Sequence, residues 1–424
     1  MSIGRRIYEL VESLYPICRS ITGDGVRRTL ALLREQIPLD VHEVPSGTAV
    51  FDWHVPREWN IRGAHVETLD GERLVDFADH NLHVMGYSVP VDRIVSHDEL
   101  MRHLHTLPQR PDWIPYRTSY YTEDWGFCTR HRDFERFRYE RYRVRIDATL
   151  APGSLSYGEL FVPGRTDREF LIFTHVCHPS LGNDNLSGVA VTAFVAKALS
   201  SRPNRYGYRF VWAPGTIGSI TWLSLNRDRA RRIEHGLVAA LLGDAGPFHY
   251  KQSRRRNADI DRLAASAIAS RGGHVLPFEP YGYDERQFCS PGFDLPVGRL
   301  TRSPNGAYAE YHTSADDLSF VSPDALERSY DLVLDIVDAA EHDRRYVNLA
   351  PHCEPQLGRR GLYRSKGGET LPERELALLW VLNLSDGGHS LLDIAERSQL
   401  PFSVLRRASE ELVEARLLAV SAGE

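Results

Sequence analysis

Two histidines and an aspartate lie within ten residues near the middle of the chain, in an order that suits metal binding. His175 and His178 belong to the run Thr174–Pro179, and Asp184 follows in the turn-rich run Gly182–Gly188. Imidazole nitrogens and carboxylate oxygens are ligands that zinc prefers, although manganese and cobalt also accept them. A single histidine at a strand end is more often structural. The added carboxylate, which the turn would direct back to the same strand end, favours a metal site.

The flanking segments predict where these side chains lie. Residues 170–173 are apolar and predict a buried strand, and the segment from Ser187 onward has the apolar spacing of a helix. The three polar side chains therefore fall on a strand-to-helix loop. Open α/β sheets place their binding sites on such loops.

Four segments of the chain resemble a known group of enzymes. The run Asn183–Gly188 resembles the bridging-carboxylate motif of the co-catalytic zinc aminopeptidases, which include bacterial leucyl aminopeptidases and glutamate carboxypeptidase. Phe51–Asn60, Asp284–Gly292 and Glu310–Asp317 resemble a bacterial branch of aminopeptidase-like domain proteins associated with polysaccharide or natural-product biosynthesis. The resemblance implies a doubly wound, mostly parallel α/β sheet of the zinc aminopeptidase type, with an inserted β-rich domain and a C-terminal winged helix-turn-helix.

The resemblance also implies a fuller set of metal ligands. Asp244 follows a second apolar strand, at the position of the family's terminal aspartate ligand, and His312 matches its last histidine. Asp184 would then lie between the ions of a site that holds one or two zinc ions. The alignment favours His175 over His178 as the first imidazole ligand, because His175 directly follows the strand. His178 would then support the ligands or face the substrate.

One position departs from this pattern. The related branch carries a glutamate after the next strand, as general base or metal ligand, and this chain has Gly215 there. The loss weakens catalysis without excluding it, because zinc alone can lower the pKa of its bound water to about 7. Glu310, two residues before His312, is the candidate replacement; the alternative is an ordinary surface carboxylate. Cys177 is a poor candidate nucleophile, because no orienting group lies near it in the sequence.

Three basic residues are candidates for substrate binding. Lys251, Arg286 and Arg302 would bind a substrate that bears a carboxylate. The arginines are among 48 in the chain, and any one of them is more often a solvated surface residue; Lys251 is one of only three lysines. We therefore expect a metal-dependent hydrolase that removes an amide-linked group from a small, peptide-like biosynthetic intermediate. The alternative is an impaired enzyme or binding module that keeps the metal pocket.

The composition limits the other functional classes. The 424 residues carry a net charge of −6, with 42% hydrophobic and 25% charged residues, which is typical of a soluble globular protein. This charge gives no reason to expect nucleic acid or membrane as the main partner. Five scattered cysteines and an N-terminal segment unlike a signal peptide predict a cytoplasmic location. We expect a homo-oligomer.

The secondary-structure patterns along the chain predict three domains. The metal-binding α/β domain is expected over residues 1–38 and 151–350, the inserted β-rich domain over 39–150, and the winged-helix domain over 365–424. Helices are expected at Gly4–Leu14, Asp24–Ile37 and Pro323–His342. The third helix of the tail carries more glutamates than arginines. A DNA-reading helix is more basic, so the tail is expected to make protein contacts.

Overall fold

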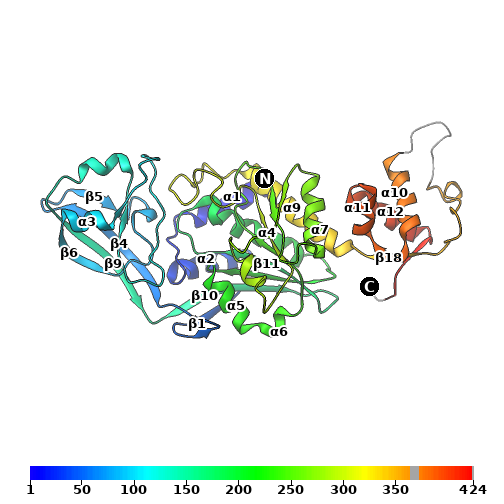
Figure 1. The fold of residues 1–424 in the computed structure, drawn as a ribbon, viewed down its shortest axis with the longest axis horizontal. Helices are drawn as coiled ribbons and strands as arrows, with labels where there is room; N and C mark the ends of the chain where they lie inside the picture. The colour runs from blue at the N-terminus through cyan, green and yellow to red at the C-terminus, as the bar shows by residue number, and fades with distance from the viewer. Residues whose placement is uncertain (363–371, 423–424) are drawn as a thin grey trace. The chain divides into compact units, whose positions relative to one another are not determined.

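The computed structural model describes residues 1–362 and 372–422, so the first residues of the expected tail domain, 365–371, lie outside it. Contacts within the chain define two compact units, one of residues 1–256 with 275–331 and one of residues 257–274 with 332–424. Figure 1 shows the ribbon from the N-terminus to the C-terminus. Within the described ranges, no helix has both the length and the apolar character needed to span a membrane.

An eight-stranded sheet forms the core of the first unit. Its order is β1-β10-β12-β11-β13-β16-β14-β15, and the four neighbours β12, β11, β13 and β16 are parallel. The pairs β1–β10, β10–β12 and β14–β16 are antiparallel. The bounds are β1 Asp40–Pro45, β10 Ser154–Val162, β11 Glu169–His175, β12 Gly207–Ala213, β13 Ile233–Ala239, β14 His249–Lys251, β15 His274–Leu276 and β16 Val297–Thr301.

The order of the strands reverses at β11. The chain runs from β11 to its neighbour β12 on one side, and then returns past β11 to β13 on the other side. Parallel crossovers are right-handed, so connections that run in opposite directions place their helices on opposite faces. The carboxyl end of β11 is therefore the switch point, where doubly wound sheets bind their ligands.

The sheet residues confirm that both faces are covered. Trp212 of β12 donates a hydrogen bond from Nε1 to Thr192 of helix α4 (2.9 Å), while Val211 shares an apolar cluster with Trp222 of α5. Because side chains alternate along a strand, these neighbours face opposite sides of the sheet. The helices of this unit are α1 Ile3–Leu14, α2 Asp24–Arg34, α3 His97–His103, α4 Gly188–Ser200, α5 Ile217–Leu225, α6 Arg227–Ala230 and α8 Glu285–Phe288, with the π-helical turn η3 Gly182–Ser187 before α4.

A second sheet lies between β1 and β10 in the sequence. Its four antiparallel strands have the order β5-β4-β9-β6, and they pack around buried aromatic and β-branched residues. Its strands are β4 Glu58–Thr68, β5 Arg73–Asp76, β6 Val91–Ser96 and β9 Arg141–Ala151, with the short strands β2 Ala49–Val50, β3 Trp53–His54, β7 Leu104–His105 and β8 Phe127–Cys128 and the turns η1 Asn81–His83 and η2 His131–Arg136 nearby. The segment is rich in β-structure, as its alternating pattern predicted.

The second unit has its own small core. Leu378, Leu391, Leu405 and Leu412 are fully buried in one apolar cluster of the tail helices. Arg262 of α7 binds Asp393 (2.6 Å) and Glu396 (2.7 Å) of α11. Its elements are α7 Asp259–Ala269, the later part of α9 Pro323–His342, η4 Gly358–Arg360, α10 Glu373–Leu384, α11 Leu391–Ser398 and α12 Phe402–Glu414, with the three-stranded sheet of β17 Arg345–Asn348, β18 Asp386–Ser390 and β19 Leu418–Val420.

The predicted helices agree closely with the structure. The helix predicted to end at His342 has the same bounds as α9, whereas α2 ends at Arg34, three residues before the predicted Ile37. The turn after Arg34 still buries Ile37. The N–H of Ile37 still donates to the carbonyl of Leu33 (3.1 Å), so the apolar spacing extends past the end of α2.

Candidate metal centre

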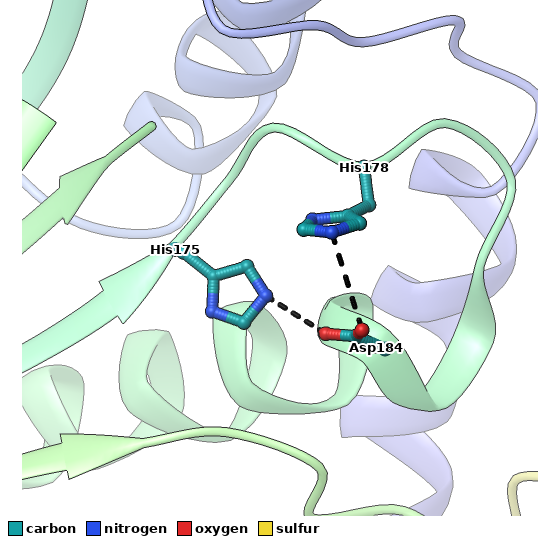
Figure 2. A group of neighbouring side chains, drawn as sticks. All are labelled: His175, His178 and Asp184. Atoms are coloured by element: carbon teal, nitrogen blue, oxygen red, sulfur yellow. Dashed lines mark hydrogen bonds and ion pairs between the residues drawn. The ribbon is translucent and has the colours of Figure 1, made fainter. Parts of the chain in front are cut away.

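The two histidines and the aspartate of the central loop meet at the carboxyl end of β11. His175 is the last residue of β11, His178 lies on the following loop, and Asp184 lies in η3 (Figure 2). The Nε2 atom of His175 is 2.8 Å from Oδ1 of Asp184, and both side chains are almost completely buried. The strand-to-helix loop therefore brings these side chains together, as the sequence predicted.

The second oxygen of Asp184 faces different partners. Nε2 of His312 is 2.9 Å from Oδ2, and Nε2 of His178 is 4.0 Å from it. The hydroxyl of Tyr283 also donates to Oδ2, at 3.3 Å. Each oxygen of the Asp184 carboxylate therefore has an imidazole beside it.

The distances between these atoms suit a metal ion. The ligand atoms of His175, His178 and Asp184 all lie within 4.8 Å of one another. Tetrahedral zinc with ligands at roughly 2.1 Å requires separations of about 3.4 Å. Small side-chain movements would thus enclose an ion. The outward nitrogen of His175, Nδ1, is buried and has no hydrogen-bond partner among the described residues.

Burial and charge act in opposite directions at this group. Burial alone raises the pKa of Asp184, but His178, His175 and His312 outweigh it and hold that pKa well below its usual range. Burial lowers the pKa of His178 to about 3, although Asp184 opposes the change. His178 is therefore neutral at physiological pH, which is the form that binds metals.

Neighbouring polar groups fix the backbone of η3. Asp316 accepts hydrogen bonds from the backbone N–H groups of Asn183 (2.5 Å) and Asp184 (2.9 Å). Asn185 donates to the hydroxyl of Thr174 (2.8 Å) and thereby ties the turn to β11. Burial raises the pKa of Asp316 to about 8. These bonds hold the Asp184 carboxylate in front of the imidazoles.

A loop of the inserted β-rich segment completes the surroundings. Ile114 and Ser314 exchange two hydrogen bonds of 2.9 Å, and the backbone N–H of Tyr116 donates to the carbonyl of His312 (2.8 Å). The ring of Tyr116 lies 5.0 Å from that of His312 and 5.1 Å from that of His178, centre to centre. His312 has a φ of 55°, which is unusual for a residue with a side chain. No local pattern predicted this support, because Tyr116 is 196 residues from His312 in the sequence.

Asp244 follows β13 at the same edge of the sheet, but its oxygens have other partners. Oδ1 accepts from the N–H of Gly246 and the hydroxyl of Ser303, both at 2.7 Å. Oδ2 accepts from the side chain of Asn183 (2.9 Å) and the N–H of Ser303 (3.3 Å). A carboxylate has about four lone-pair positions, and these donors fill them. The structure does not bring Asp244 into the group around Asp184.

The position that lacks a glutamate and its candidate replacement follow different elements of the fold. Gly215 follows β12, and its N–H donates to Sγ of Cys177 (3.3 Å). Glu310 is half-buried, and in the described structure its backbone carbonyl accepts from the N–H and the hydroxyl of Thr313. Burial raises the pKa of the Cys177 thiol to about 12, so this cysteine is not an activated nucleophile.

The three basic residues predicted to bind substrate differ in burial and in their bonding partners. Lys251 is buried, and its Nζ binds Glu285 (2.8 Å) and the carbonyl of Tyr281 (2.6 Å). Arg302 is buried against Phe248, with its guanidinium 4.3 Å from the ring centre, and burial lowers its pKa. Arg286 is half-buried on α8. The structure therefore does not gather these cations around Asp184.

The fold and this site define an aminopeptidase-like protein with a C-terminal winged helix. Residues 8–343 match the family model described as a domain of unknown function, DUF4910, and residues 344–420 match a winged helix-turn-helix model. The chain belongs to the DUF4910 family. It is 50% identical over 418 residues, 98% of this chain and 96% of the relative, to a Clostridium acetobutylicum protein whose name describes polysaccharide biosynthesis and an aminopeptidase-like domain.

Solved structures confirm the fold. A crystal structure titled as that of a peptidase from Clostridium acetobutylicum has a TM-score of 0.94 and 49% identity, and covers 98% of this chain and 96% of its own. The zinc aminopeptidase BSAP of Bacillus subtilis has a TM-score of 0.57 and 14% identity, with coverage of 80% and 95%. At that identity the likeness shows the shared fold. The predicted family resemblance and fold class are thus confirmed.

Proposed function

We propose that this protein is a metal-dependent hydrolase that cleaves an amide or peptide bond of a small biosynthetic intermediate. The observation that carries the proposal is the convergence of His175, His178 and His312 on the two oxygens of the buried Asp184. The zinc aminopeptidase among the similar folds and the relative named for polysaccharide biosynthesis support the reaction and the setting.

The donor set suits one zinc ion. His175, His178 and Asp184 would hold it, with His312 beside them on Oδ2. Imidazole nitrogens and carboxylate oxygens match the common ligands of catalytic zinc. A second ion would require further carboxylates, and the hydrogen bonds of Asp244 and the absence of a side chain at Gly215 oppose this. We therefore favour one firmly held ion.

Several residues of the chain would have separate roles around that ion. Bound zinc polarises a carbonyl group and lowers the pKa of water to about 7. His178 stays neutral and ready to bind. Tyr283 stacks on His175, with ring centres 4.8 Å apart, and presents its hydroxyl to Asp184. The ring of Tyr116 packs against the rings of His178 and His312 and helps to orient them.

Metal analysis of purified protein tests the first part of the proposal. Zinc-reconstituted wild type should retain about one ion per chain after dialysis, and Asp184→Asn should retain far less. Asp317→Asn is the matched control, because Asp317 lies one residue beyond the supporting Asp316 and its side chain bonds only to Ser319 in the described structure. Equal zinc in wild type and Asp184→Asn would refute the proposed site.

A second candidate function is a binding module that holds the metal without turnover. Gly215 favours it, because general-base assistance contributes about 10²–10⁴-fold to a rate. Hydrolysis of leucine, alanine and glutamate p-nitroanilides by the zinc-loaded protein separates the two functions. Turnover abolished in Asp184→Asn supports the hydrolase, whereas zinc binding without turnover on amide substrates supports the binding module.

The C-terminal unit is proposed to make protein contacts. The α12 helix carries Glu410, Glu411 and Glu414 beside its two arginines, and Arg406 lies 3.5 Å from Glu410. This intrahelical pairing leaves little net positive charge for a DNA backbone. We infer a role in self-association.

A further inference from the structure

Asp284 is a buried carboxylate with only one oxygen engaged. Its side chain is 1% exposed, and Oδ1 accepts from the N–H of Thr216 (2.8 Å) and the hydroxyl of Ser219 (2.5 Å) at the start of α5. Over the residues that the structure describes, no group donates a hydrogen bond to Oδ2. One oxygen of this carboxylate thus supports a helix end, and the other has no donor among the described residues.

Oδ2 of Asp284 lies next to the position that a side chain at residue 215 would occupy. A Cβ atom at this position would lie 3.9 Å from Oδ2 of Asp284, 3.7 Å from Cβ of His175 and 3.6 Å from Sγ of Cys177. These are ordinary contact distances, and the φ of Gly215 is not in the left-handed region. A longer side chain there would extend from a point that His175 and Asp284 flank.

Within the described ranges, no lysine or arginine side chain bonds to Asp284. Lys251, which is close in the fold, binds the neighbouring Glu285 instead (2.8 Å), and Arg299 donates to Asn305 (2.9 Å). Burial raises the pKa of Asp284, while Ser219 and His175 oppose the rise. A buried carboxylate without a cation is costly, and such groups concentrate at functional sites.

We propose that Asp284 is the proton acceptor of the hydrolysis and replaces the side chain that Gly215 lacks. This inference rests on the proposed function. Oδ2 takes one proton from a water molecule as the water oxygen bonds to the carbonyl carbon of the substrate. The proton then passes to the leaving nitrogen as the carbon–nitrogen bond breaks, which yields a carboxylic acid and an amine and restores Asp284. Its raised pKa makes it a stronger base than an exposed aspartate.

The Asp284→Asn variant tests this role without removing the helix support. The asparagine oxygen can still accept from Thr216 and Ser219, whereas the new NH₂ group cannot accept a proton. We expect wild-type zinc content, a fall in kcat for leucine p-nitroanilide of about 10²–10⁴-fold, and loss of the acidic limb of the pH profile. Binding of leucine hydroxamate, measured by calorimetry, should weaken at least about tenfold (~1.4 kcal/mol). Ser219→Ala removes one bond to Oδ1 and should leave the hydroxamate affinity within about threefold.

The outcomes separate this inference from the proposed function. Wild-type rates and hydroxamate affinity in Asp284→Asn would overturn the inference and leave the hydrolase intact. The same losses in Glu310→Gln instead would assign the base to Glu310. Zinc-loaded wild type that binds no hydroxamate also overturns the inference, whereas wild type that binds no zinc overturns the proposed function itself. Recovery of activity when Gly215→Glu is added to Asp284→Asn would support the proposal that Asp284 replaces the side chain that Gly215 lacks.

Discussion

The ends of β11 and β13 each place an aspartate at the same edge of the sheet, but the two aspartates have different hydrogen-bond partners. Each strand is buried and is followed by a loop with a buried aspartate, Asp184 after β11 and Asp244 after β13. Two imidazoles and a tyrosine hydroxyl bond to the oxygens of Asp184. Backbone N–H groups, a serine and an asparagine bond to those of Asp244.

The two sets of donors differ in whether they can lose a proton and bind a metal ion. An imidazole nitrogen that donates to a carboxylate can bind a metal once it loses its proton, so the group around Asp184 can exchange hydrogen bonds for metal bonds. Backbone N–H groups cannot bind metals. The bonds of Asp244 instead fasten the loops of β13 and β16 to η3. Residue type and position in a sheet therefore do not predict which partners a buried aspartate has in the folded chain.

Matched substitutions at these two aspartates should give the largest contrast. Asp184→Asn should lower zinc affinity by more than about 100-fold, because changes at groups that only support a ligand already cost 10–100-fold. Asp244→Asn should keep zinc affinity within about tenfold and lower the free energy of unfolding by about 1–3 kcal/mol. Competition with a zinc chelator and urea unfolding measure the two quantities. An equal loss of zinc in both variants would make Asp244 a ligand.

Removing the Tyr116 ring should have an intermediate effect on the β11 site. Tyr116→Ala takes away the aromatic cover of His178 and His312, and zinc affinity should fall about 10–100-fold. Tyr116→Phe keeps the ring and should retain the affinity, with an unchanged visible spectrum of the cobalt-substituted protein. A spectrum that is unaltered in Tyr116→Ala would show that the inserted segment does not position the imidazoles.

Two histidines with lowered pKa values allow a pH comparison of the same strands. Burial lowers the pKa from 6.5 to about 3 both for His178, after β11, and for His235, in β13. In that window the unfolded chain binds protons that the folded chain does not, so the stability of the metal-free protein falls as the pH falls from 6.5 toward 3. His178→Gln and His235→Gln should each flatten this slope in urea unfolding at pH 7 to 4. Only His178→Gln should weaken zinc binding; a loss of zinc in His235→Gln would contradict the separation of the two strands.

Truncation after His342 should have the smallest effect on the metal site. Zinc content should be unchanged, while the oligomeric state measured by light scattering should shift toward the monomer. Sequence-specific DNA binding by the full chain at physiological salt would contradict the proposed role of the tail. Loss of zinc on truncation would show that the site depends on the second unit.

The sequence determined much of the fold and part of the site. Local apolar patterns predicted β11 and α9. The nine-residue spacing of His175 and Asp184 predicted that these two candidate ligands meet across a single turn. His312, which lies 128 residues beyond Asp184, was found only because its segment resembles a family motif. Asp284 belongs to another such segment, but nothing in its neighbours indicated its free oxygen.

The tertiary structure alone decided which polar groups remain available. Lys251 has the positive charge needed to bind an anionic substrate, yet its ammonium group forms an ion pair with Glu285, 34 residues away. Asp244 has the position of a metal ligand, yet Ser303 and Asn183 occupy its oxygens. Tyr116 reaches the imidazoles from an inserted segment that the sequence could place only as β-rich. A buried polar atom bonds to whatever the folded chain brings within about 3 Å, and these partners come from strands and loops distant in sequence, so their identity is a property of the packed structure.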